Sequence, residues 1–190
     1  MNEDKTTAPS RRLPRKATRK SLENAALHYL ERFSTSRENL RRVLSRRVRR
    51  SAMAHGTDPA EGARWIDEIV EKLERLGILD DRAYAETRVA SLRRRGVSSR
   101  VIRAKLRIKG VEDEIVDTTI DQAEPDLTAA IALARKRGLG PFRTGDRAAF
   151  RERDLSVLAR AGFSYDVALE VVDAESAYSL EGMSVPGSEG

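Results

Sequence analysis

Apolar residues recur at intervals of three and four from residue 21 onward, which is the spacing of one face of an α-helix. Ser36 is expected to cap a second helix, because its hydroxyl can accept a hydrogen bond from a free amide of the first turn. A looser stretch, 51–59, separates this helix from a third, which Gly77 is expected to end. The pattern therefore predicts three helices within residues 21–79, with these apolar stripes: Leu22, Ala26, Leu27 and Leu30; Leu40, Val43 and Leu44; Trp65, Ile66, Ile69, Val70, Leu73 and Leu76.

The same plan returns in residues 80–124. Asp80 or Asp81 is expected to cap the first helix of this segment, and Ser98 the second. Aligning Ser36 with Ser98 brings many apolar positions of the two segments into register. The matched pairs are Leu22 and Tyr84, Leu27 and Val89, Leu30 and Leu92, Leu40 and Ile102, and Leu44 and Leu106. Residues 80–124 are therefore interpreted as a second three-helix repeat.

A third copy is expected in residues 125–173. Its first helix is predicted over 126–137, and the Gly-Leu-Gly-Pro sequence at 138–141 cannot continue that helix. Aligning the glycines at the ends of the second helices pairs Gly110 with Gly162, Val111 with Phe163, Ile115 with Val167, Val116 with Ala168, Thr119 with Val171, and Ile120 with Val172. The register is poorer in the second helix, where Asp154 falls at the position of Ile102.

These segments predict an all-α protein of three tandem three-helix repeats, which form a short curved solenoid because neighbouring repeats bury one another's apolar faces. The composition agrees, with 5% aromatic residues and abundant helix-forming Ala, Leu, Arg and Glu. Residues 1–20 hold seven basic residues against two acidic ones, so a disordered basic tail is expected there. Residues 174–190 lose the periodicity and gain Gly, Ser and Glu, which predicts a loose C-terminal tail.

Residue types that support chemistry are scarce. The chain has no Cys, and its only histidines, His28 and His55, have no second ligand at metal spacing, so no metal site is expected. The adjacent Asp80 and Asp81 side chains should point apart at a helix start, where capping explains them. No phosphate-cradling glycine loop or nucleophile motif occurs. We therefore predict no catalytic residue, no metal and no cofactor.

The expected location is the cytoplasm. The first 20 residues carry charge but lack the apolar core of a signal peptide, and no later run approaches the roughly 20 apolar residues of a membrane span. The absence of Cys also suits a reducing interior. These features predict no association with a membrane. The protein is expected to be a monomer.

Charge is segregated within the repeats. Residues 88–109 contain nine basic residues and no acidic one, whereas 112–126 contain seven acidic residues and no basic one. In the first repeat, 37–50 is mainly basic and 61–81 mainly acidic. Two interpretations stay open. Either a continuous basic face binds an anionic partner, or the opposite charges pair within the protein and keep it soluble.

Arg100, Arg103 and Arg107 favour a basic face, since their spacing off the apolar stripe predicts that they project together from one exposed side of a helix. Exposed ion pairs stabilise a protein by only about 0–1 kcal/mol each, so stability alone is a weak reason for such a cluster. The predicted partner-binding side chains are Arg41, Arg42, Arg46, Arg93, Arg94, Arg95, Arg100, Arg103, Arg107 and Lys109.

Several short segments of the chain resemble a known family. They are 76–85 (Leu-Gly-Ile-Leu-Asp-Asp-Arg-Ala-Tyr-Ala), 94–98 (Arg-Arg-Gly-Val-Ser), 106–111 (Leu-Arg-Ile-Lys-Gly-Val) and 158–165 (Leu-Ala-Arg-Ala-Gly-Phe-Ser-Tyr). In this order and spacing they make the chain, over about residues 22–173, similar to the RecX family of bacterial regulatory proteins. The resemblance implies a tandem three-helix fold and a modulator, usually an inhibitor, of the RecA recombinase. Such a modulator lies in the groove of the RecA–DNA filament and affects its ATPase and strand exchange.

The resemblance thus implies two partners, the RecA filament and the nucleic acid within it. An alternative is a sequence-nonspecific DNA-binding protein that acts without the recombinase, because two short helices after a turn resemble a helix-turn-helix. Few Asn, Gln or Ser residues accompany Arg100 to read bases, so such binding would not depend on sequence. An enzyme has the least support, since acid–base chemistry generally uses His, Cys or a sheltered carboxylate set.

Overall fold

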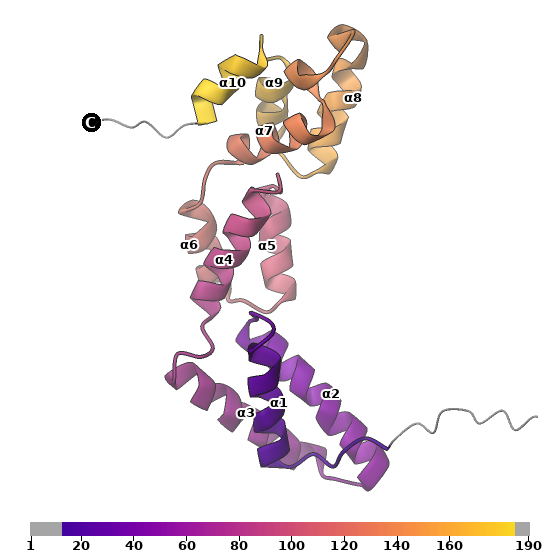
Figure 1. Ribbon diagram of the computed structural model, residues 1–190, viewed down its shortest axis with the longest axis vertical. Coiled ribbons are helices and arrows are strands. Elements are labelled where there is room, and N and C mark those ends of the chain that lie inside the picture. The colour runs from indigo at the N-terminus through magenta and orange to yellow at the C-terminus, as the bar shows by residue number, and fades with distance from the viewer. Residues whose placement is uncertain (1–12, 185–190) are drawn as a thin grey trace, which may run out of the picture. The chain divides into compact units, whose positions relative to one another are not determined.

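The computed structural model describes residues 13–184, with side chains described as far as residue 180. Within that part of the chain, ten α-helices and one short 3₁₀ helix follow one another without a strand, which confirms the all-α expectation (Figure 1). The chain divides into two compact units after Leu79. The helices are α1 (Arg19–Leu30), α2 (Arg37–His55), α3 (Pro59–Arg75), α4 (Asp81–Arg93), α5 (Ser99–Ile108), α6 (Asp113–Asp121), α7 (Asp126–Arg137), η1 (Gly140–Phe142), α8 (Arg147–Arg160), α9 (Tyr165–Val172) and α10 (Ala177–Ser184).

Repeat 1 consists of α1, α2 and α3, which pack around one apolar core. The Ser36 hydroxyl caps α2 as expected, by accepting from the Asn39 amide at 3.2 Å. α2 continues through residue 55, into the stretch 51–59 that was predicted to be loose, because it keeps an inward face there that α3 covers closely. At Gly62 of α3 an added methyl group would lie 2.5 Å from a methyl of Val48. The core contains Leu22, Ala26, Leu40, Leu44, Val48, Ile66, Ile69, Val70, Leu73 and Leu79.

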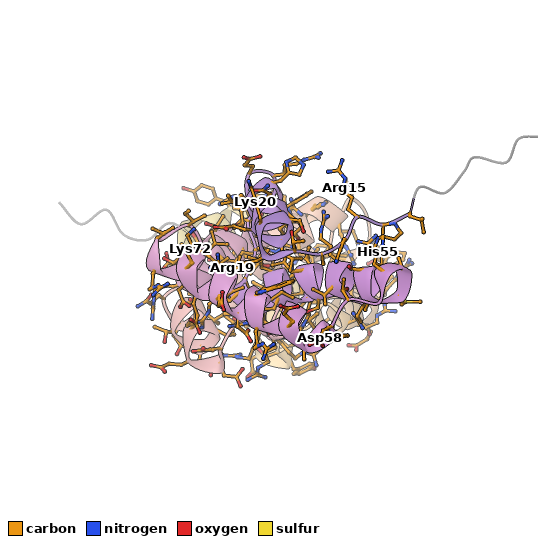
Figure 2. The ribbon with its side chains drawn as sticks, turned by 90° about the horizontal axis from the view of Figure 1, so that it is seen from below. Arg15, Arg19, Lys20, His55, Asp58 and Lys72 are labelled. Carbon is orange, nitrogen blue, oxygen red and sulfur yellow. The ribbon has the colours of Figure 1, made fainter. Side chains whose placement is uncertain are left out.

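The segment before α1 packs on repeat 1, on the side where Figure 2 labels Arg15 and His55. Ala17 is buried, and its amide donates to the Ser51 hydroxyl at 2.8 Å. His55 Nε2 lies 2.5 Å from the backbone oxygen of Pro14. The expected disordered tail is therefore shorter than 1–20, because the chain already finds partners on α2 from residue 14 onward. Its first twelve residues lie outside the part of the chain that the structure describes.

Repeat 2 consists of α4, α5 and α6. Asp80 caps α4, since its carboxylate accepts from the amides of Arg82 at 2.8 Å and Ala83 at 3.0 Å. Ser98 occupies the expected position before α5, but its hydroxyl makes no bond to that helix and instead donates to the backbone oxygen of Ala161 at 2.9 Å. The core contains Tyr84, Ala85, Val89, Leu92, Ile102, Leu106, Val111, Val116 and Ile120.

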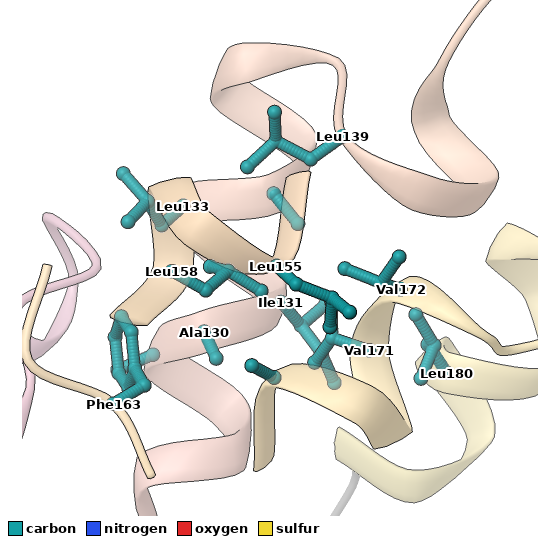
Figure 3. Packing of buried hydrophobic residues seen from close by; sticks show 13 residues of the cluster. Ala130, Ile131, Leu133, Leu139, Leu155, Leu158, Phe163, Val171, Val172 and Leu180 are labelled. Atoms are coloured by element: carbon teal, nitrogen blue, oxygen red, sulfur yellow. The ribbon is translucent and has the colours of Figure 1, made fainter. Parts of the chain in front are cut away.

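Repeat 3 contains α7, η1, α8 and α9, and α10 packs against it (Figure 3). α7 spans the predicted residues and ends at Gly138, whose φ is 61°. α10 corrects the expectation of a loose tail from residue 174, because Leu180 is buried in the same core as Val171 and Val172. A helix with one inward apolar residue leaves little periodicity in the sequence, which is why the pattern did not reveal it.

Asp154 explains the poor register of the third repeat. Its position corresponds to the buried Ile102, and Asp154 is likewise buried at 1% exposure. The carboxylate accepts from the Gly140 amide at 2.9 Å and from two nitrogens of the Arg143 side chain. These hydrogen bonds raise the pKa of Arg143 above its ordinary value. A buried ion pair thus replaces an apolar contact and ties the η1 turn to α8.

Candidate functional site

The ten cations predicted to bind a partner divide into two groups by what they contact. Five donate to carboxylates of the protein itself, and these pairs are Arg41 with Asp67 at 3.1 Å, Arg42 with Glu38 at 3.0 Å, Arg103 with Asp117 at 2.8 Å, Arg107 with Asp113 at 2.6 Å, and Arg93 with Asp126. The other five are exposed. Among the described residues, Arg46, Arg94, Arg95 and Arg100 form no ion pair with a carboxylate, whereas Lys109 interacts with another group of the protein. Both interpretations of the charge pattern therefore describe part of the surface.

Arg93 was predicted to bind a partner, but the structure places it inside the protein. Its side chain is only 6% exposed, and besides Asp126 it donates to the Ser99 hydroxyl at 2.6 Å. Its Nε is buried without a hydrogen-bond partner among the described side chains. Arg93 lies inside the protein because it pairs with the carboxylate of Asp126, the first residue of α7. Arg93 thus joins repeats 2 and 3 and does not face a partner.

Asp126 is the acceptor at this contact between repeats 2 and 3. Burial acts to raise the pKa of Asp126, but the hydrogen bonds from Arg93 and from the amide and hydroxyl of Ser99 outweigh burial and lower the pKa below its ordinary value of 3.8. The Ser99 amide donates at 2.8 Å, so the carboxylate also satisfies a free N–H in the first turn of α5. The N-terminus of α7 and that of α5 are fixed by the same group.

Arg103 and Arg107 differ from the expectation that they project freely beside Arg100. Both turn toward α6 and meet carboxylates there. Arg107 and its partner are more than half exposed, so this ion pair contributes little to stability. Only Arg100 of the three lacks such a partner, and it lies near Gly162 of repeat 3.

In repeat 1, the exposed end of α2 forms a shallow basic hollow. Arg46, Arg49, Arg50 and Met53 line this hollow. Arg50 Nε donates to the backbone oxygen of Arg46 at 3.3 Å, which holds one guanidinium group against the helix. Arg41 and Arg42 lie one turn earlier on the same helix and are tied to carboxylates, so the cations available for a partner gather toward the end of α2.

Repeats 2 and 3 enclose a second basic groove. Arg95 is the one predicted site residue among those that line it. The groove has a volume of about 400 Å³, and its floor includes Val97, Val101 and Leu133. Five cations line it, namely Arg95, Lys105, Lys136, Arg137 and Arg160. Lys136 and Arg137 lie in the last turn of α7, in a repeat that carried no predicted site residue. The basic ending of α7 was visible in the sequence, but its position opposite α5 was not.

The described part of the chain has neither a metal-binding cluster nor a membrane span. Residues 13–180 hold no group of three or more His, Cys, Asp or Glu side chains that could bind a metal ion. Within the same range, no helix is both long and apolar enough to cross a bilayer. What the surface offers is cationic contact with an anionic partner.

Comparison with known proteins agrees with this picture. A model of the second three-helix domain of RecX matches residues 80–120, which are α4, α5 and most of α6. Regulatory protein RecX of Myxococcus xanthus is 48% identical over 181 residues, which cover 92% of this chain and 96% of that protein. The RecX proteins of Agrobacterium fabrum and Mycobacterium leprae are each 34% identical, over 78% and 74% of this chain and 80% and 85% of their own length.

No solved structure matches the chain significantly. The sequence matches nevertheless run through all three repeats, and the matched family consists of regulatory proteins, not enzymes. The chain therefore belongs to the RecX family of regulatory proteins.

Proposed function

We propose that this protein binds the filament of the RecA recombinase and DNA and lowers its ATPase and strand-exchange activity. It does so as a monomer, in the cytoplasm, without a cofactor. Family membership supports a regulatory role. The observation that carries the mode of action is the set of exposed cations without a carboxylate pair, which includes Arg94 and Arg100.

Such cations suit a filament because it presents both phosphate groups and acidic protein side chains. A guanidinium fork can bind either of them in a bidentate manner. Arg94 and Arg100 flank the turn between α4 and α5, so both act from one rigid segment of repeat 2. Neither has to break an internal ion pair before it binds, whereas Arg103 and Arg107 do. We therefore assign the first pair, and not the second, to the contact.

The test compares two double variants of equal charge loss. Arg94→Ala with Arg100→Ala should weaken co-sedimentation with preformed recombinase filaments, and weaken ATPase inhibition, by about tenfold or more, which corresponds to about 1.4 kcal/mol. Arg103→Ala with Arg107→Ala is the matched control and should change inhibition by less than about threefold, since exposed pairs contribute little. Equal effects of the two variants would reject this assignment, and wild-type protein that leaves the filament ATPase unchanged would reject the function.

A second candidate is a DNA-binding protein that acts without the recombinase, and the five-cation groove favours direct contact with nucleic acid. This candidate predicts the same DNA affinity with and without recombinase, and no change in ATPase. The control for sequence dependence is a set of oligonucleotides of equal length and different sequence, which should bind alike.

A further inference from the structure

The groove between repeats 2 and 3 concentrates positive charge without any acid to balance it. Lys105 comes from α5, Lys136 and Arg137 from α7, and Arg160 from α8, while Arg95 lies in the turn after α4. No carboxylate is among the residues that line the groove. The one described bond of these five side chains is from Arg160 Nε to the backbone oxygen of Ser156, at 3.1 Å.

Other cations of α5 are neutralised by carboxylates of the protein itself. Arg103 and Arg107, on the side of α5 that faces α6, both meet aspartates. Lys105, between them in sequence, points to the opposite side and meets none. Cations in a last helical turn favour that end of the helix, but this effect does not require three helix ends to bring their cations into one groove. An anion from outside the protein would relieve the mutual repulsion of these cations.

Backbone contacts hold the walls of the groove at a fixed separation. Gly96 has a φ of 73°, and an added methyl group there would lie 2.8 Å from the Leu133 amide nitrogen. Gly162 approaches Ser98 so closely that an added methyl would lie 2.5 Å from its hydroxyl oxygen. The Ser98 hydroxyl bond to Ala161 crosses the same junction. The helix ends that carry the cations are thus held in place before any ligand arrives, which favours binding.

The lining residues indicate which anion fits. The groove has no aromatic side chain on which a base could stack and no Asn or Gln that could read a base edge. It also has no aromatic pocket of the kind that anchors protein partners. Lysines and arginines around a small apolar floor are suited to phosphate groups and the sugar faces between them. A phosphodiester backbone uses all of these features, whereas an acidic peptide uses only the charge.

We propose that the groove between repeats 2 and 3 binds the sugar–phosphate backbone of a nucleic acid strand, without regard to its sequence. The inference deepens the proposed function, which rests on a filament that contains such a strand. The binding step itself is independent of the recombinase, so it can be tested with nucleic acid alone.

The experiment measures the affinity of the full chain for a labelled oligonucleotide by fluorescence anisotropy over a series of salt concentrations. Single-stranded and duplex forms are separate arms that identify the source of the backbone. Lys136→Ala with Arg137→Ala is the groove variant, and Arg103→Ala with Arg107→Ala removes equal charge outside the groove. The groove variant should reduce the slope of log K against log salt by about 1.4–1.8, since each lost phosphate contact contributes about 0.7–0.9. The control should leave the slope within about 0.5 of that of the wild type.

Equal slopes for the two variants would overturn the inference, and so would wild-type binding to polyglutamate that is as tight as its binding to DNA. Circular dichroism and urea unfolding of both variants show whether each is folded, and Lys105→Ala alone provides a second, milder groove variant with the same expected direction. Loss of DNA binding with intact wild-type-like inhibition of the recombinase would support the groove while showing that inhibition does not need it. Intact DNA binding with lost inhibition would overturn the groove and leave the proposed function standing.

Discussion

Asp154 accepts two hydrogen bonds from the Arg143 side chain and a third from the Gly140 amide. Asp154→Ala should lower the free energy of unfolding by about 3 kcal/mol, because it leaves a cation and a buried N–H without their acceptor. Urea unfolding followed by circular dichroism measures the change. Asp113→Ala is the control, since this carboxylate is 66% exposed in its pair with Arg107 and its loss should change stability by less than about 1 kcal/mol.

Replacing Gly96 and Gly77 by Ala distinguishes the loss of stability caused by a strained backbone from the loss caused by steric crowding. Both have a positive φ, of 73° and 66°, but an added methyl meets Leu133 at 2.8 Å from Gly96 and nothing within 4 Å from Gly77. Gly77→Ala should cost about 1–2 kcal/mol for the strained conformation. Gly96→Ala should cost a further 1–3 kcal/mol, roughly, for overpacking. Thermal unfolding of the two variants gives the difference, and equal losses would mean that repeats 2 and 3 do not press together at this point.

The Arg93–Asp126 pair should show strong coupling in a double-mutant cycle. Each single change to Ala leaves a partly buried charge alone and should cost about 3 kcal/mol, whereas the double change should cost clearly less than the sum. A coupling free energy of about 1–3 kcal/mol from urea unfolding is expected. The pair Arg42 and Glu38, one turn apart on α2, is the exposed reference and should couple by about 0.3–0.5 kcal/mol. Similar values for both pairs would contradict the structural role of Arg93.

Asp126 should also contribute to the pH dependence of stability. Its pKa is lowered in the folded protein from an ordinary value of 3.8, so its ionised form favours the fold. That contribution is complete above about pH 5 and is lost as the pH falls through the folded pKa, below 3.8. Asp126→Asn should therefore be less stable than the wild type at pH 6, and the difference should shrink between pH 4 and pH 3, roughly. A difference that stays constant down to pH 3 would contradict the assignment; urea unfolding at each pH measures it.

Leu180 should make α10 part of the third repeat. Its side chain is 1% exposed in the core beside Val172, and Leu180→Ala should lower the free energy of unfolding by about 2–4 kcal/mol. Tyr178→Ala, on the same helix, removes a larger side chain that is 84% exposed and should change stability by less than about 0.5 kcal/mol. Chemical unfolding of both variants compares them, and a small loss at Leu180 would show that α10 is dispensable for the core.

Local signals account for most of what the sequence predicted correctly. Ser36 and Asp80 cap helices, and Gly77 and Gly138 end them, because each acts on backbone groups within four residues of itself. Apolar spacing identified the helix faces for the same reason. The helices of all three repeats could therefore be located without knowledge of their neighbours.

Long-range contacts account for what was missed. From the sequence, Arg93 resembles any exposed cation, because its partner Asp126 is 33 residues away. Lys136 and Arg137 read as the charged end of a helix until α5 lies across from them. The burial of Asp154 was visible only as a break in the pattern. In each case the deciding partner came from a different element or from a loop, which no local pattern reports.

The hydroxyl of Ser98 has a second possible use. In the intact chain it reaches across to Ala161, and α5 begins without the side-chain cap that Ser36 supplies to α2. If repeat 3 were detached, the hydroxyl could rotate back and accept from the first turn of α5, as serine does at other helix starts. The severed state would thus recover part of what it loses. A truncation experiment will accordingly underestimate the free energy of interaction between the two repeats, because the truncated chain gains a helix cap that the intact chain lacks.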